Sequence, residues 1–255
     1  MRAVFILALG ALAGACAGEE DDGPFRPGGG GGGGGGMTGG DARQADAVTV
    51  GDGGALLAGQ VCVVTDLRVP RACPAVPERE AVAVAVRGTT AMTTSAANGG
   101  FALPVLDAQV TLVVATGSTT LVRSYVPTAV TGAAVDAPVV TQAAYDAVIG
   151  SLGTVVPDNN GTVVAYVRDG AAAAEGVAFA PIAGSSLAPF YDNGSATSWV
   201  QGGGTGVAGV ALFVDVPVGS VTLDGVATDS RVAQVTVPVA ADTVTFVNVT
   251  LADPP

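Results

Sequence analysis

Hydrophobic and polar residues alternate in short segments from residue 55 onward. The clearest segment is 81–86, in which alanine and valine alternate, so that its three valines share one face of an extended chain. Alternation with a period of two predicts strands, and the Gly, Asn and Asp residues between segments predict turns. The predicted strands are 56–64, 81–86, 101–103, 110–115 and 121–126, then 162–167, 177–182, 210–214, 218–223, 232–237 and 243–251. Many short, regularly spaced strands indicate an all-β sandwich and not a βαβ fold.

One segment departs from this alternation. Residues 142–149 have the apolar spacing of a short helix, and Gly150 is a typical helix end. We therefore expect residues 141–153 to connect two strand-rich regions, 55–140 and 154–255.

The two strand-rich regions resemble each other in sequence. Gly-Phe-Ala-Leu at 100–103 leads to Val-Thr-Leu at 110–112, and Gly-Val-Ala-Leu at 209–212 leads to Val-Thr-Leu at 221–223. A repeated turn, strand and loop of this kind predicts two copies of one domain. Each copy has the length of a seven-stranded sandwich, which is normally about 100 residues. The predicted fold is therefore all-β, with two tandem Greek-key β-sandwich domains.

The first 15 residues predict an export signal. Arg2 precedes an apolar run that ends at Cys16, and this run is shorter than the ~20 residues that span a bilayer. Small residues directly before a Cys resemble the lipobox of bacterial lipoproteins, which implies lipidation of the Cys16 thiol. The lipobox usually has Leu where Ala13 stands, and the same small residues fit an ordinary signal-peptidase site. Lipidation and simple secretion therefore both stay open.

Residues 16–54 have the composition of a disordered linker. An acidic run at 19–22 is followed by two prolines and by nine consecutive glycines at 28–36. Such a segment cannot bury enough apolar surface to offset its ordering entropy. As a flexible chain it would reach roughly 35 Å. The acidic run serves solubility, or it acts as a sorting signal of the kind that follows the lipidated Cys in some lipoproteins.

The three cysteines suggest different roles. Export places them in an oxidising compartment, where Cys62 and Cys73 can form a disulfide that staples one predicted hairpin. Cys16 would then be unpaired, as lipidation requires. The alternative for Cys62 and Cys73 is a pair of buried free thiols.

Composition excludes several classes of function. The chain has no His and no Lys, and its 22 acidic residues exceed its 10 basic ones, for a net charge of -12. Without His there is no Ser-His-Asp or Cys-His catalysis and no His-ligated zinc. Without Lys there is no Schiff base, P-loop or Lys-Asn isopeptide bond. The acidic balance argues against nucleic-acid binding. We expect no catalytic residues, no cofactor and no metal site.

Three local motifs fit ordinary turns better than ligand sites. Residues 204–209 match G-x-G-x-x-G with Asp229 at a suitable distance, but a strand and not a helix follows them. Asp158-Asn159-Asn160-Gly161 and Asp192-Asn193-Gly194 offer oxygen ligands beside glycine, yet neither supplies the alternating ligand set of a calcium loop.

Aromatic residues concentrate in one predicted loop of the second region. Phe190, Tyr191 and Trp199 lie there in a chain with few aromatics. Tyr191 and Trp199 are the candidate ligand-binding residues, as a platform for a sugar or a peptide. The alternative is that Phe190 and Trp199 cover the end of the sandwich core. Tyr191, beside Asp192, is expected to be the most exposed of the three aromatics.

Several short motifs resemble the carboxypeptidase regulatory-like domain, a transthyretin-like (prealbumin-like) sandwich. In the first region they are 59–62, 81–86 and 93–104, where Thr94, Asn98, Gly99 and Phe101 approximate the family's Thr-x-x-(Asp/Asn)-Gly-x-Phe turn with one extra glycine. In the second region, 161–170 and 176–179 resemble the opening of the domain, but Val210 stands in place of the later aromatic. Ig-like sandwiches give a similar pattern. The resemblance implies a binding module without catalysis.

Together these features predict a cell-envelope lipoprotein with a structural or binding role, held at an outer membrane or cell surface through Cys16. Its two sandwiches would contact an extracellular protein or glycan. The alternatives are a secreted accessory module of a hydrolase system and an enzyme that uses a pair of carboxylates.

Overall fold

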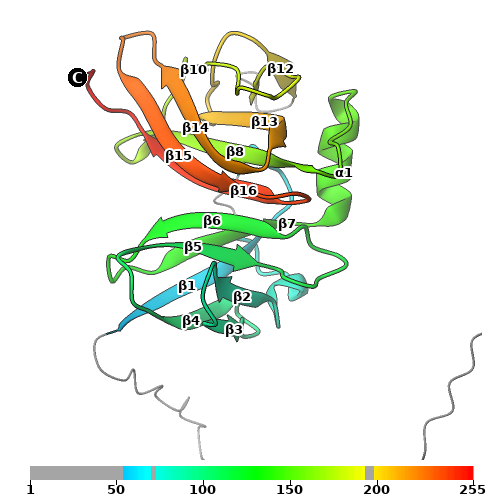
Figure 1. Cartoon of the computed structure of the whole chain (residues 1–255), viewed down its shortest axis with the longest axis vertical. Coiled ribbons are helices and arrows are strands. Elements are labelled where there is room, and N and C mark those ends of the chain that lie inside the picture. The colour runs from blue at the N-terminus through cyan, green and yellow to red at the C-terminus, as the bar shows by residue number, and fades with distance from the viewer. Residues whose placement is uncertain (1–53, 70–72, 193–197, 255) are drawn as a thin grey trace, which may run out of the picture. The chain divides into compact units, whose positions relative to one another are not determined.

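The computed structural model describes residues 54–69, 73–192 and 198–254, and nearly all of its regular structure is β-strand (Figure 1). The predicted signal peptide, Cys16 and most of the predicted linker lie outside these residues. The first half contains β1 (Ala55–Val64), the 3-10 turn η1 (Pro77–Arg79), β2 (Ala83–Val86), β3 (Met92–Thr94), β4 (Gly100–Val105), β5 (Gln109–Val114), β6 (Ser124–Ala129), β7 (Val135–Val140) and α1 (Gln142–Ser151). The second half contains β8 (Asn160–Asp169), β9 (Ala172–Ala173), β10 (Ala178–Phe179), β11 (Phe190–Asp192), β12 (Trp199–Gln201), β13 (Val210–Pro217), β14 (Gly219–Val226), β15 (Val232–Val239) and β16 (Val244–Thr250).

The first half is a β-sandwich. In one sheet, β1 lies between β4, which is antiparallel to it, and β7, which is parallel to it. The other sheet has the order β3-β2-β5-β6. Alternate residues of each strand point inward, as the valines at 82, 84 and 86 show, and they bury a core that also contains Phe101 and Leu112. The period of two therefore identifies the inward face correctly.

The second half repeats this topology, which confirms two tandem sandwiches. Strand β8 lies between β13, antiparallel, and β16, parallel, just as β1 lies between β4 and β7. The facing sheet is β10-β14-β15. Both Val-Thr-Leu segments place Val and Leu in their own half's core.

Two turn glycines show how the sequences of the two halves align. Gly99 and Gly209 both have positive φ, 81° and 69°, and their carbonyls accept from the N–H of Val61 and of Val167 at 2.8 Å. Gly99 is thus the equivalent of Gly209, so the sequence alignment of Gly100 with Gly209 is wrong by one residue. Because side chains alternate between faces, this shift matters: the inward position of Phe101 corresponds to Ala211 and not to Val210.

The two halves share a third core. Strand β16 pairs in parallel with β6 through Val244–Ser124 and Thr245–Tyr125. One face of β13-β8-β16 packs in the core of the second sandwich, and the other, outer face is also apolar. Residues of both halves and of α1 cover this outer face. This shared core comprises Val64, Leu67, Val122, Val140, Ile149, Val164, Tyr166, Phe190, Val210, Leu212, Val214, Val244 and Phe246.

Helix α1 forms where the sequence predicts it and packs on the shared core. The side chain of Thr141 caps its start by accepting from the N–H of Ala144 at 3.2 Å. The helix ends at Ser151, one residue beyond the predicted stop at Gly150. No helix among the described residues is long and apolar enough to cross a membrane.

Candidate functional site

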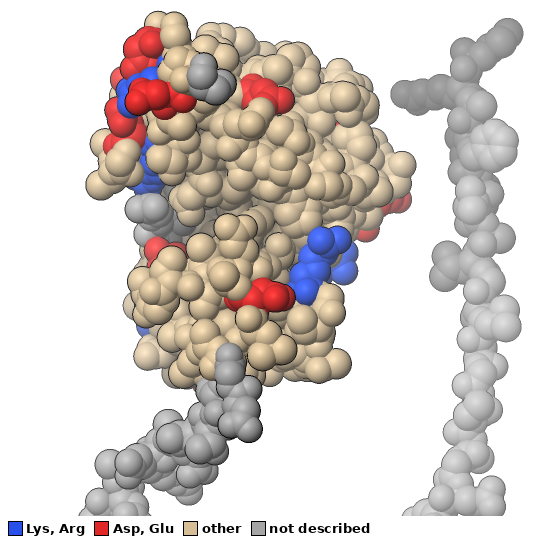
Figure 2. Space-filling model, turned by 60° about the vertical axis from the view of Figure 1, so that its left-hand side comes forward, with Lys and Arg blue, Asp and Glu red and all other residues tan. Residues whose placement is uncertain are grey.

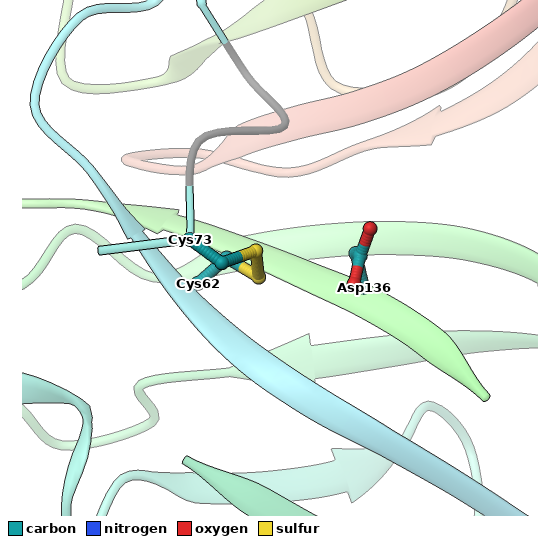
Figure 3. Close-up of side chains that lie close together, drawn as sticks. All are labelled: Cys62, Cys73 and Asp136. Carbon is teal, nitrogen blue, oxygen red and sulfur yellow. A yellow bond between two sulfur atoms is a disulfide. The ribbon is translucent and has the colours of Figure 1, made fainter. Parts of the chain in front are cut away.

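Cys62 and Cys73 form a disulfide, with their Cα atoms 4.5 Å apart (Figure 3). The expectation that this bond staples a hairpin is wrong, because Cys73 lies in no strand and β1 pairs with β4 and β7. The bond instead ties the segment that follows β1 back onto β1. That segment carries Asp66 and Arg68.

Removing this disulfide is expected to lower the free energy of unfolding. Cys62→Ala/Cys73→Ala frees a loop whose ends are 11 residues apart, for which we expect a loss of about 2–3 kcal/mol. Urea unfolding of the full chain measures it. Reductant should destabilise the wild type and leave the double variant unchanged; equal stability of the two proteins without reductant would contradict the prediction.

The same two cysteines lie beside Asp136 of β7, and the potential ligand atoms of the three residues are within 4.8 Å of one another (Figure 3). This is the one such cluster in the described part of the chain. Its sulfurs are joined to each other and are not thiolates, so the cluster does not have the chemistry of a metal site.

Asp66 and Arg68 form a closely bonded ion pair. The backbone N–H and the Nε of Arg68 both donate to Oδ1 of Asp66 at 2.9 Å, and Nη2 donates to Oδ2 at 2.7 Å. The side-chain hydrogen bond from Arg68 is the main cause that lowers the pKa of Asp66 below its usual value, against the opposing effect of burial. Both groups are therefore charged at neutral pH, and their charges compensate.

Trp199 begins β12 and lies directly opposite Asp192 of β11. Its indole is half-buried against the shared core and partly open to solvent. Asp192 itself anchors residues 206–210. Its carboxylate accepts from the backbone N–H groups of Gly206 and Ala208 at 2.8 Å and of Val210 at 3.0 Å.

These features meet in a groove of about 350 Å³. One wall is the Asp66–Arg68 pair, the second is α1, and Trp199 forms the third. We call this the Trp199 groove. Its lining residues are Thr65, Asp66, Arg68, Ala144, Ala147, Val148, Ser151, Leu152, Ser198 and Trp199.

The structure separates the two aromatic residues that the sequence grouped as ligand-binding candidates. Tyr191 is only 2 % exposed, so the expectation that it is the most exposed aromatic is wrong. Its hydroxyl accepts from the backbone N–H of Phe179 at 2.8 Å, and its side chain packs in the core of the second sandwich. Trp199 lines the groove, and residues 193–197 of the predicted loop lie outside the described residues.

Asp66, Arg68 and α1 were not recognised as site residues from the sequence. An Asp-x-Arg triplet is too common to indicate a site, and more than a hundred positions separate it from Trp199. Only the packing of the two halves brings them together.

A second hollow, of about 240 Å³, lies between β6 and β7 on one side and β8 and β16 on the other. Its lining includes Asp136, Asn248 and Tyr166. Tyr166 is 4 % exposed, and its hydroxyl has no hydrogen-bond partner among the described residues. Burial raises the pKa of this phenol well above its usual value, so it stays protonated.

The described residues of the three local motifs serve the fold, and Asn193 and Gly194 lie outside the described residues. The backbone N–H groups of the G-x-G-x-x-G segment that could bind a phosphate are occupied by the carboxylate of Asp192. Asn160 donates to Oδ1 of Asp215 at 2.5 Å, beside a bulge in β13.

The face of the molecule shown in Figure 2 has few charged side chains and no broad basic patch.

No protein-family model and no curated protein matches this sequence. Among solved structures, the chain is similar to GBS52, the minor pilin of Streptococcus agalactiae, at 11 % identity and a TM-score of 0.23, over 78 % of this chain and 97 % of that one. It is also similar to the shaft pilin SpaA of Lactobacillus rhamnosus GG, at 10 % identity and a TM-score of 0.21, over 79 % and 99 % of the two chains. At these TM-scores the likenesses carry no argument about function.

Proposed function

We propose that this chain is a non-catalytic binding protein of a bacterial cell envelope, and that it holds an extracellular partner in the Trp199 groove. The observation that carries the proposal is that a half-buried indole and a doubly hydrogen-bonded ion pair line one groove. Ligand sites commonly combine an aromatic surface with a few polar groups that fix orientation.

The chemistry of the groove supports binding over catalysis. Asp66 has a lowered pKa and is therefore a poor general acid, and a guanidinium does not release its proton at neutral pH. The whole chain lacks His and Lys, so imidazole bases and lysine nucleophiles are absent.

The proposed location rests on the amino-terminal sequence and on the disulfide. Residues 1–15 are proposed to be a signal peptide, Cys16 to carry the lipid, and 16–54 to link it to the sandwiches. A Cys62–Cys73 disulfide supports an oxidising compartment and leaves Cys16 without a partner among the cysteines. The proposed location is an outer membrane or a cell surface. The repeated topology supports the proposal that both sandwiches are carboxypeptidase regulatory-like modules.

Metabolic labelling with a clickable fatty acid tests the anchor. We expect label on the wild-type chain and none on Cys16→Ser, with Cys62→Ser as the control that keeps the label. An unlabelled wild type, or a labelled Cys16→Ser variant, would contradict lipidation and favour secretion.

Retention on the envelope fraction of the producing cells tests the binding role. All proteins in this test carry Cys16→Ser, so that the lipid plays no part. Arg68→Ala is expected to reduce retention roughly tenfold, because it removes charge-assisted hydrogen bonding at the groove. The matched control is Arg231→Ala, since Arg231 pairs with Asp229 across the same two-residue spacing, with its backbone N–H and Nε both bonded to that carboxylate. Equal retention of both variants and the parent would contradict the proposed function.

A further inference from the structure

We infer that the ligand of the Trp199 groove is a neutral saccharide. This inference rests on the proposed function and adds the chemical class of the ligand. Three features of the groove carry it: the support of the indole, the compensated charge of the ion pair, and the size of the groove.

The indole of Trp199 is held as a firm platform. Part of it packs against the shared core, and β12 is fixed by pairing with β11. The face of an indole is electron-rich. The C–H bonds on one face of a pyranose ring are apolar and slightly positive, so the two flat surfaces attract each other.

The Asp66–Arg68 pair offers both donors and acceptors without net charge. A guanidinium has five N–H donors, of which Nε and one on Nη2 bind Asp66. Each carboxylate oxygen can accept more than one hydrogen bond. A sugar hydroxyl donates and accepts at once, so neighbouring hydroxyls match a surface on which planar donors and acceptors lie side by side.

Charge compensation also decides against ionic ligands. An acidic ligand would compete with Asp66 for Arg68 and approach a protein of net charge -12. A basic ligand would compete with Arg68 for Asp66. A neutral ligand meets neither cost.

The helix wall and the size of the groove suit a short ligand with an apolar face. Ala144, Ala147 and Ser151 line this wall together with the larger Val148 and Leu152, so the wall is mostly apolar. The groove, at about 350 Å³, lies near the lower limit of about 300 Å³ for small-molecule sites. It has the room for a short saccharide segment.

The fluorescence of Trp199 tests the inference directly, because it is the single tryptophan of the chain. The full chain with Cys16→Ser is titrated with maltotetraose, cellotetraose, laminaritetraose and chitotetraose. We expect a saturable change in emission with at least one of them. Arg68→Ala should raise its dissociation constant roughly tenfold, and Arg68→Lys should also weaken binding because it loses the planar fork. Arg231→Ala should behave like the parent.

Thermal unfolding of each variant excludes loss of folding as the cause. No saturable change with any of the four sugars at millimolar concentration would overturn the inference. So would a change of equal affinity in Arg68→Ala, because the sugar would then bind elsewhere. If the sugars fail while Arg68→Ala still reduces envelope retention, the saccharide is wrong and the binding role stands. If retention is also unaffected, both fail.

Discussion

Replacing Phe246 with alanine is expected to lower the free energy of unfolding by about 3–5 kcal/mol. Phe246 is 1 % exposed, and its ring stacks on that of Tyr166, with centroids 6.4 Å apart. It lies in the shared core, where residues of both halves meet. The cavity would therefore weaken the junction of the two sandwiches as well as β16 itself. Urea unfolding measures the loss.

Hydrogen exchange shows where the Phe246→Ala structure loosens. We expect faster exchange at β16 and also at β6, its partner in the first half. Phe101→Ala, in the core of the first sandwich, should instead speed exchange in that sandwich and spare β8 and β16. Exposed Val218→Ala is the control for unfolding, with an expected change within about 0.5 kcal/mol. A Phe246→Ala variant whose faster exchange stops at the second half would contradict a shared core.

Asp192→Ala is expected to cost about 3 kcal/mol or more, because it leaves three backbone N–H groups without their acceptor in a buried region. Asp192 is 1 % exposed and also faces Trp199 across β11 and β12. The variant should therefore shift the emission of Trp199 in the folded state. Urea unfolding and fluorescence check the two effects.

The matched control for Asp192→Ala is Asp224→Ala, which removes an exposed carboxylate that accepts from Gln234. We expect its stability to change by less than about 0.5 kcal/mol and its emission to stay unchanged. Similar small effects for both variants would show that Asp192 does not hold the segment before β13.

Much of the fold was predictable from the sequence because one physical signal dominates it. Period-two alternation identifies the inward valines of β2 and the Val-Thr-Leu segments of both cores. Strand β7 was missed because Asp136 and Pro138 are unfavourable in strands. The proline is tolerated since β7 is at the edge of its sheet, with β1 on one side only.

Other features depend on contacts that no local pattern records. Tyr191 sits beside a charged residue and looks exposed, yet its side chain packs in the core of the second sandwich. Asp192 is buried as well, and it binds three N–H groups of a later segment. Trp199 was a candidate, but Asp66 and Arg68, which line the same groove, come from the other half of the chain. These residues come together because the apolar outer face of β13-β8-β16 has to be buried away from water. The first half and α1 pack on that face and bury it.

The groove therefore forms where Asp66, Arg68 and α1 lie beside Trp199. Each sandwich has its own core, but the Asp66–Arg68 pair belongs to the first half and the indole to the second. A chain with either half removed would lack part of the groove. The shared apolar core is the physical reason that the two copies pack as one unit.

Amide exchange of the full chain, with and without soluble fragments of the bacterial cell envelope, tests the central claim most directly. The claim is that the Trp199 groove is the binding surface. It predicts slower exchange at residues 65–69, in α1 and at residues 198–201, with little change elsewhere. Protection at β6 and β7 around the second hollow, with none at the groove, would contradict it.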